Sequence, residues 1–247
     1  MQISPRCYAL TGFAYTPPWG VNAGIIAGNE TTLIVDSGPT RLAAETILGY
    51  ARAVRPSNRI LVINTEQHLD HIGGNCLFVE EGIDVYGHKD INRSDADLQA
   101  DINEYHSCIP EKARRDRHEE KFLFARTVIV NPTKKITTDM RLDLGGLHAE
   151  VLLTPGHTST NLSVFIPSDR VAYCGDAVVS GYSPNLGGGT SVDWKIWLES
   201  LKRIAGLNVE VLVCGHGSVL WGASVAAEIG RVRGILEMAT KESKEPG

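Results

Sequence analysis

The chain has 247 residues, of which 43% are hydrophobic and 21% charged, and its formal net charge is −5. This composition is typical of a globular protein with a sizeable core. It excludes the basic footprint of a nucleic-acid-binding protein. The sequence has no apolar stretch near ~18 residues, which excludes a membrane-spanning helix. The five cysteines form no CxxC pair, which argues against a disulfide scaffold and a zinc ribbon. Because no apolar leader opens the chain, we expect a cytoplasmic protein.

The first third of the chain is predicted to contain short strands and one helix. Strands are expected at residues 8–15, 23–27 and 31–36, the last two joined by the turn Gly28-Asn29-Glu30. Residues 41–54 have helical spacing. Residues 59–64 form a short apolar run, typical of a buried strand, and residues 84–87 are predicted as another strand.

A long polar segment follows at residues 88–126. We predict it to be a helical insertion within one domain that spans residues 1–247. Its dense charge of both signs favours a solvated helix face. Its position along the chain would also suit a lid.

The second half repeats the alternation of strands and helices. Strands are predicted at residues 127–131, 141–144, 147–153, 161–166 and 170–174. A glycine-rich loop at 180–191 leads to a helix at 193–205, for which Asp193 is the predicted N-cap. A strand at 210–213 precedes a last helix at about 222–241, whose apolar positions are Val225, Ile229, Val232, Leu236 and Ala239. The repeated pattern indicates two similar halves, each a sheet with outer helices.

The strongest chemical signal follows the buried strand at residues 59–64. Four residues of metal-binding types occur within six positions, in the order Glu66, His68, Asp70 and His71. Positions 66, 68 and 70 would point the same way in an extended chain, while His71 would point the other way. Such a cluster can therefore reach two metal positions. Gly73 and Gly74 then allow a tight turn into a helix.

Three further strands each end near a glycine followed by a possible ligand. The segments are Pro155-Gly156-His157, Gly175-Asp176 and Gly215-His216. Each is weak alone, because an isolated histidine more often has a structural role. Their recurrence at three predicted strand ends indicates one shared site.

Together with Ile34-Val35-Asp36-Ser37-Gly38, these motifs resemble the metallo-β-lactamase superfamily, which includes glyoxalase II and acyl-homoserine lactonases. The resemblance covers about residues 20–219. It implies an α+β fold, the four-layer αβ/βα sandwich, with metals held between the sheet edges. It does not specify a substrate.

The resemblance also implies roles for individual residues. The implied ligands of the first metal include His68 and His157, and Asp176 is the implied bridging carboxylate. The implied ligands of the second metal are Asp70, His71 and His216.

Glu66 departs from the family pattern, which usually has histidine at this position. Glutamate can also bind zinc, and we expect Glu66 to complete the first site. It would add a third carboxylate, so that two divalent cations and one hydroxide reach about zero net charge instead of about +1. We therefore expect a less acidic bound water and tolerance of Mn²⁺ or Fe²⁺ beside the favoured Zn²⁺. A partly empty first site and a role for Glu66 outside the ligand set remain alternatives.

The predicted function is hydrolysis by a hydroxide that bridges two metals and attacks a carbonyl group. Esters, lactones, thioesters and amides are candidate substrates, with β-lactams among them. Asp70 is expected to orient the water or accept its proton, Asp176 to be essential, and Tyr182 to donate a hydrogen bond to an oxyanion. The alternatives are an iron-dependent sulfur dioxygenase or diiron redox enzyme, and a degenerate member without activity. We expect a small-molecule substrate, with no nucleic-acid or membrane partner, and the sequence indicates no oligomeric state.

Overall fold

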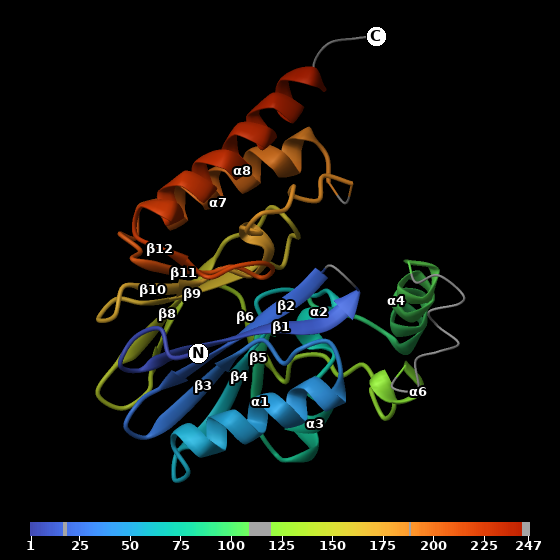
Figure 1. Ribbon diagram of the computed structural model, residues 1–247, viewed down its shortest axis with the longest axis vertical. Helices are drawn as coiled ribbons and strands as arrows, with labels where there is room; N and C mark the ends of the chain where they lie inside the picture. Colours follow the sequence, from blue (N-terminus) through green and yellow to red (C-terminus); the bar gives the residue numbers. More distant parts are fainter. Residues whose placement is uncertain (17–18, 109–119, 188, 244–247) are drawn as a thin grey trace.

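Two six-stranded β-sheets form the centre of the protein, as seen in the computed structural model, which describes residues 1–16, 19–108, 120–187 and 189–243. Helices cover the outer face of each sheet (Figure 1). The layers therefore run helix, sheet, sheet, helix, and the predicted four-layer αβ/βα sandwich is confirmed.

The first sheet has the strand order β1-β2-β3-β4-β5-β6. Strands β1 to β3 pair antiparallel, and strands β3 to β6 pair parallel. The parallel part brings the carboxyl ends of β3, β4 and β5 to one edge of the sheet, so the motif after β4 lies at that edge. The strand bounds are β1 (Cys7–Thr16), β2 (Trp19–Ala27), β3 (Thr31–Val35), β4 (Arg59–Ile63), β5 (Val85–His88) and β6 (Lys134–Ile136).

The second sheet has the order β12-β11-β10-β9-β8-β7. Strands β10 and β11 pair parallel, and the other neighbours pair antiparallel. The strand bounds are β7 (Met140–Asp143), β8 (His148–Leu153), β9 (Leu162–Ile166), β10 (Val171–Tyr173), β11 (Val211–Val213) and β12 (Leu220–Trp221).

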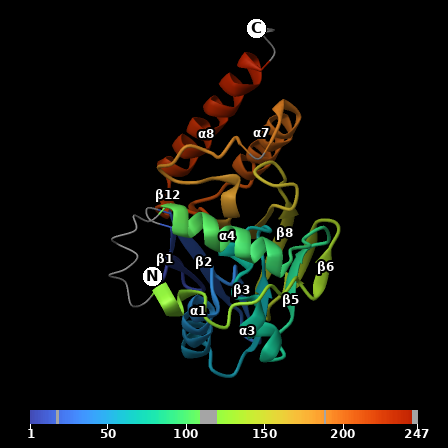
Figure 2. The same cartoon turned by 90° about the vertical axis from the view of Figure 1, so that its right-hand side faces the viewer.

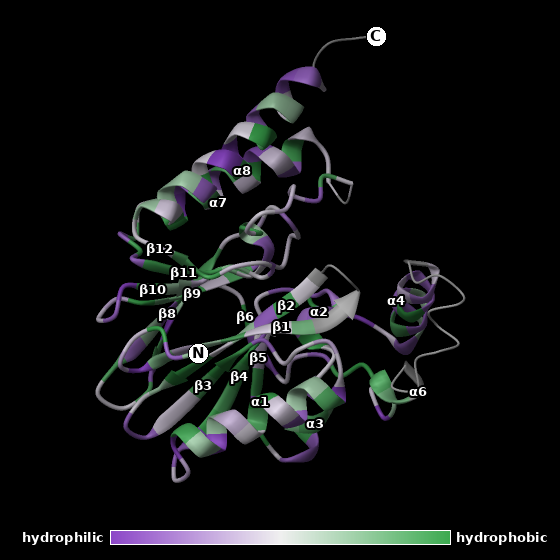
Figure 3. Cartoon of the chain, viewed as in Figure 1, coloured by the Kyte–Doolittle hydropathy of each residue, from purple (hydrophilic) through white to green (hydrophobic). Residues whose placement is uncertain are grey.

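Apolar side chains of both sheets pack against each other to form the central core. This core includes Leu33, Val35 and Ile63 from the first sheet and Val151 and Val164 from the second. Figure 3 shows hydrophobic colouring along much of β3 and β4. Since each buried aliphatic side chain contributes about 1.5–3 kcal/mol, this layer fixes how the two sheets face each other.

The long helices α1, α7 and α8 each bury one face against a sheet. Helix α1 begins after Thr40, whose side chain accepts a hydrogen bond from the Ala43 amide, and it packs Ile47 and Ala51 on the first sheet. Helices α7 and α8 cover the second sheet (Figure 1). The helix bounds are α1 (Arg41–Val54), α2 (Leu69–Ile72), α3 (Asn75–Glu80), α4 (Asp95–Cys108), α6 (Glu120–Leu123), the 3-10 helix η1 (Gly175–Ala177), α7 (Ser191–Ala205) and α8 (Ala223–Glu242).

The last helix follows its predicted pattern. Val225, Ile229, Val232 and Leu236 are buried, whereas Ala239 is half-buried. Within the described ranges, no helix combines the length and apolarity needed to cross a membrane.

The start of α7 differs from the prediction. Thr190 is the N-cap, and Asp193 is the third residue of the helix. The Asp193 carboxylate accepts hydrogen bonds from the Thr190 amide and hydroxyl at 2.8 and 2.7 Å. The two residues form a capping box, in which an acidic side chain three positions into the helix imitates an N-cap in the sequence.

The polar segment at residues 88–126 is only partly helical. It contains α4 and α6, residues 89–94 are not helical, and residues 109–119 lie outside the described residues. Figure 2 shows α4 lying across the side of the sandwich.

The strand predicted at residues 127–131 is wrong. The backbone groups of these residues form hydrogen bonds with side chains instead of with a neighbouring strand. Asn75 donates to the Val130 carbonyl at 2.9 Å, and Asp95 accepts from the Ile129 amide at 3.1 Å. The paired strand of this region is β6, which begins at Lys134.

Candidate metal centre

Four loops carry the predicted ligands to one edge of the sandwich. Glu66 and His68 follow β4, and the short helix α2 supplies Asp70 and His71. The other three loops follow β8, β10 and β11, and they carry His157, Asp176 and His216 in that order. Asp176 lies in η1, which begins shortly after β10. All seven side chains meet between the two sheets, and they fall into overlapping groups that could each hold an ion.

The first group consists of Glu66, His68 and His157. Glu66 Oε1 lies 2.8 Å from His68 Nδ1 and 3.6 Å from His157 Nε2. The two histidine nitrogens are 3.3 Å apart. Glu66 is fully buried, so its carboxylate belongs to the interior of the site. The structure therefore places the one atypical residue of the motif among the first set of donors.

The second group consists of Asp70, His71 and His216. Asp70 Oδ2 lies 3.1 Å from His216 Nε2 and 3.8 Å from His71 Nε2. Asp70 and His71 are adjacent in helix α2, and successive side chains of a helix point in different directions around its axis.

Asp176 lies between the two groups. Its Oδ2 is 3.5 Å from His157 Nε2 and 3.3 Å from His216 Nε2, and its Oδ1 is 3.4 Å from His71 Nε2. One carboxylate thus contacts histidines of both sets, as a bridging ligand must. Gly215 approaches it so closely that an added Cβ would overlap Asp176 Oδ1. Glycine next to a ligand is therefore a steric requirement here.

The donor atoms fit divalent cations. Among the described residues, Glu66 Oε2, His71 Nε2 and Asp176 Oδ1 are buried and have no hydrogen-bond partner. Buried polar atoms without partners are costly, and metal coordination removes that cost. Carboxylate oxygens with imidazole nitrogens are a donor set that suits Zn²⁺, Mn²⁺ and Fe²⁺.

The same charges perturb the titration of the site. Contact with Glu66 raises the pKa of His68 to about 9. Burial opposes ionisation of His216, but Asp176 and Asp70 raise its pKa to about 10. Burial also opposes ionisation of Asp176, and His216 and His71 hold its pKa well below the usual value. In the metal-free protein, protonated histidines therefore balance the carboxylates, and bound cations would replace those protons.

His71 is oriented by Asp36, the acid of the early motif. His71 Nδ1 lies 2.9 Å from Asp36 Oδ2, which leaves Nε2 for the site. Asp36 also accepts from the Thr65 amide at 2.7 Å and the Thr65 hydroxyl at 2.8 Å. Its φ is 64°, a conformation that non-glycine residues adopt rarely and that tends to occur at functional sites. A carboxylate behind a ligating histidine fixes the ring and its tautomer.

Asn22 holds the loop of His216, a role that the sequence analysis missed. Its side-chain amide donates to the carbonyls of Cys214 at 2.9 Å and Gly217 at 3.0 Å. Its backbone amide donates to the Gly215 carbonyl at 2.8 Å. In the sequence, the one indication of this role is an asparagine directly before the apolar residues 23–27. Asn22 is buried in the structure.

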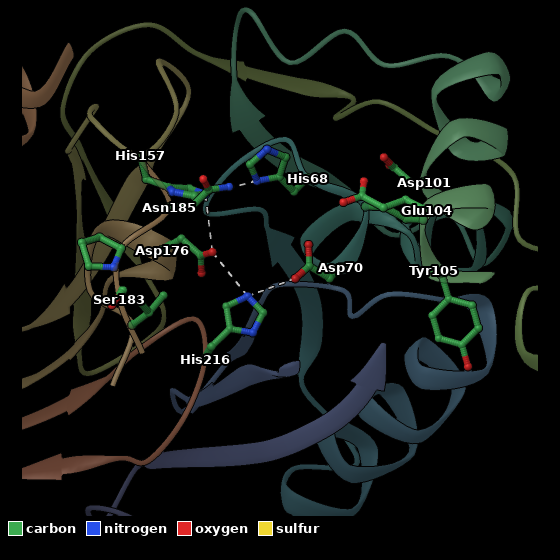
Figure 4. Close-up of a pocket in the computed structure, with 13 residues that line it drawn as sticks. His68, Asp70, Asp101, Glu104, Tyr105, His157, Asp176, Ser183, Asn185 and His216 are labelled. Carbon is green, nitrogen blue, oxygen red and sulfur yellow. Dashed lines mark hydrogen bonds and ion pairs between the residues drawn. The ribbon is translucent and has the colours of Figure 1, made fainter. Parts of the chain in front are cut away.

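A cavity of about 500 Å³ opens beside the two ligand groups. Figure 4 shows its two sides, with the ligands facing side chains from α4. Helix α4 contributes Asp101, Glu104 and Tyr105, and the segment after η1 contributes Ser183, Pro184 and Asn185. Tyr182, the predicted oxyanion donor, is not among the described residues that line it, although its neighbours are. Its catalytic role stays a prediction.

Arg93 ties α4 to the ligand motif. Its guanidinium lies 2.7 Å from Asp101 on α4, and it donates to the Gln67 carbonyl at 3.4 Å. The polar segment at residues 88–126 thus supplies one wall of the cavity.

Comparisons with known proteins agree with this geometry. Residues 16–216 match the Metallo-beta-lactamase superfamily. The chain is 34% identical over 202 residues to a hydroxyacylglutathione hydrolase of Idiomarina loihiensis, covering 81% of this chain and 62% of the relative. It is 24% identical over 207 residues to the Beta-lactamase-like protein 2 homolog of Caenorhabditis elegans, covering 81% of this chain but only 57% of that relative.

A metallo-beta-lactamase from Pontibacter korlensis has a similar solved structure, with a TM-score of 0.70 at 18% identity, covering 96% of this chain and 97% of that one. At that identity the likeness shows the fold alone. The superfamily match, by contrast, covers most of the chain and all seven donors. The chain belongs to the Metallo-beta-lactamase superfamily.

Proposed function

We propose that the protein is a metal-dependent hydrolase of carbonyl compounds: esters, lactones, thioesters or amides, including β-lactams. The observation that carries this proposal is a pair of donor groups that share Asp176 at the wall of a cavity. When bound at such a site, two divalent cations supply a strong nucleophile near neutral pH and polarise the carbonyl. The hydroxyacylglutathione hydrolase among the relatives supports a hydrolytic reaction.

The protein's own residues would position the reactants. Asp70 lines the cavity, and its Oδ2 lies 3.1 Å from His216 Nε2. We assign Asp70 the task of orienting a water molecule in the cavity and accepting its proton. Asp176 contacts histidines of both groups and would keep them at a fixed separation. We retain Tyr182 as a proposed donor to the oxyanion, which requires its side chain to reach the cavity when substrate binds.

We propose Zn²⁺ as the main cofactor, with Mn²⁺ and Fe²⁺ as functional substitutes. Zinc suits both groups, because each combines two histidines with one carboxylate. Glu66 adds an oxygen donor and a negative charge to the first group, which favours harder cations than an all-histidine site does.

An iron-dependent redox reaction is the second candidate, because of the composition of the first group. Glu66, His68 and His157 are one carboxylate and two histidines. This combination, with open positions, is also the donor set of non-haem Fe(II) oxygenases. Six donors besides Glu66 keep the residue type of the family motif, which argues against a degenerate member without activity.

One experiment separates these functions. The metal content is measured in protein purified without added metal, and the protein is then reconstituted in parallel with zinc, manganese and iron. Each form is assayed with lactone, thioester, phosphoester and β-lactam substrates and for oxygen consumption. We expect metal-dependent hydrolysis of at least one carbonyl substrate. Iron-dependent oxygen consumption without any hydrolysis would contradict the proposal and favour the second candidate.

A further inference from the structure

Glu104 stands out on the cavity wall opposite the ligands. It lies on α4 and lines the cavity, and its side chain is exposed. The neighbouring wall residue Asp101 forms an ion pair with Arg93 at 2.7 Å. Among the described residues, no ion pair involves the Glu104 carboxylate. Its exposed carboxylate lies on the α4 side of the cavity (Figure 4) and can contact a molecule there.

Outside the ligand groups, the described lining of the cavity offers Glu104 no cationic side chain. Among the described residues that line it, none is a lysine or arginine. The polar lining outside the ligands and α4 consists of Ser183 and Asn185, which are neutral. A substrate with a free carboxylate would find no cationic partner on these walls, and it would meet the like charge of Glu104.

We infer that Glu104 selects substrates that carry a positively charged group away from the reacting carbonyl. This inference rests on the proposed function, because it concerns the substrate of the same site. The carbonyl end would approach the ligand groups, and the cationic end would lie against α4. Opposite charges at an exposed position attract weakly but measurably, and salt screens the attraction. Such a charge changes selectivity more than total affinity.

The test compares two non-hydrolysable ligands, the S-propyl thioethers of thiocholine and of 3-mercaptopropionate, bound to the zinc-loaded protein. The first ligand is cationic and the second anionic. The carboxylate of the anionic ligand is also attracted to the metals. This attraction is the same in wild type and Glu104→Gln, so it cancels when the two proteins are compared for each ligand. We expect the variant to bind the cation about two- to fivefold more weakly and the anion correspondingly more tightly. Glu104→Lys should enlarge both changes, and both should shrink as salt rises.

Glu199→Gln is the matched control. Glu199 lies on α7, is highly exposed, pairs with Lys202 at 3.5 Å and does not line the cavity. This variant should leave both dissociation constants unchanged. Unchanged dissociation constants in both Glu104 variants would overturn the inference.

Hydrolysis of the corresponding S-acetyl thioesters is measured in parallel. Charge-dependent binding without hydrolysis of any carbonyl substrate would leave the inference standing and defeat the proposed function. Hydrolysis of a carbonyl substrate, with no effect of the Glu104 variants on the binding of either ligand, would support the proposed function and overturn the inference about Glu104.

Discussion

Replacing Asn22 with alanine is expected to weaken the second metal site without changing any of its ligands. Asn22 is buried at the base of the loop that carries His216. Its side chain donates to the carbonyls of Cys214 and Gly217, which flank that histidine on both sides. The truncation leaves both carbonyls without this donor and frees the loop to shift.

The expected magnitude follows from these bonds. Two buried carbonyls that each lose a partner cost about 1–3 kcal/mol apiece, and relaxation reduces the total to about 2–4 kcal/mol of unfolding free energy. Loss of a group that orients a ligand lowers metal affinity by about 10- to 100-fold. That factor removes a further ~1.4–2.8 kcal/mol of metal-dependent stabilisation.

The assay is urea unfolding of wild type and Asn22→Ala, with chelator and with saturating zinc, together with zinc titration against a competing chelator. Asn58→Ala is the matched control. Asn58 also donates two hydrogen bonds, to the Gly28 carbonyl at 2.9 Å and the Thr32 hydroxyl at 3.2 Å, away from the ligands. The Asn58→Ala variant should lower the free energy of unfolding by the same amount with and without zinc. If Asn22→Ala lost stability but kept wild-type zinc affinity, the proposed link to His216 would be refuted.

Three further predictions concern the ligands and the adjacent loop. Glu66→His should raise the affinity for zinc relative to manganese about tenfold or more, because it removes a buried carboxylate from the first group; competitive metal titration measures the ratio. Asp176→Ala should lower turnover at least 1,000-fold and reduce bound metal, and full activity with full metal content would contradict our assignment. Hydrogen bonds from Arg231 and the Gly181 amide lower the pKa of Glu228 below its usual 4.5, so its contribution to stability is present above that pH and is lost in acid. Glu228→Gln should therefore be about 1 kcal/mol less stable than wild type at pH 7, and a gap that persisted at pH 3 would count against this pair.

One exposed aspartate serves as a control for the site variants. Asp90 pairs with Lys89 at 2.7 Å on the surface and contacts none of the seven donors. Asp90→Ala should keep wild-type metal content and activity, which separates the loss of Asp176 from the general loss of an aspartate.

The grouping of the seven candidate donors is predictable from the sequence because each donor motif begins within a few residues of a strand end. The apolar run before Glu66 and the short strands before His157, Asp176 and His216 indicate one shared sheet edge. Strand ends are fixed by hydrogen-bonded pairing, so a side chain just beyond a strand has a predictable position. The structure accordingly brings these residues together.

Other features of the fold and the site depend on contacts between residues far apart in the chain, which local sequence patterns do not reveal. The backbone at Val130 is satisfied by Asn75, which is 55 positions away in the sequence, so the expected strand does not form. Glu104 lies on a polar helix whose charges suit a solvated face, and only the packing of α4 beside the site places Asp101 and Glu104 on the cavity wall. Asn22 acts through carbonyls nearly 200 residues further along the chain.

The most direct test of the two-metal centre is the number of divalent ions bound per chain. Chelator-treated protein is titrated with zinc, unbound metal is removed by dialysis, and the bound metal is measured together with hydrolysis. We predict two ions per wild-type chain, with hydrolysis that disappears on chelation and returns with metal. A chain that retains no metal after this treatment, or that hydrolyses substrate equally well in excess chelator, would contradict the account.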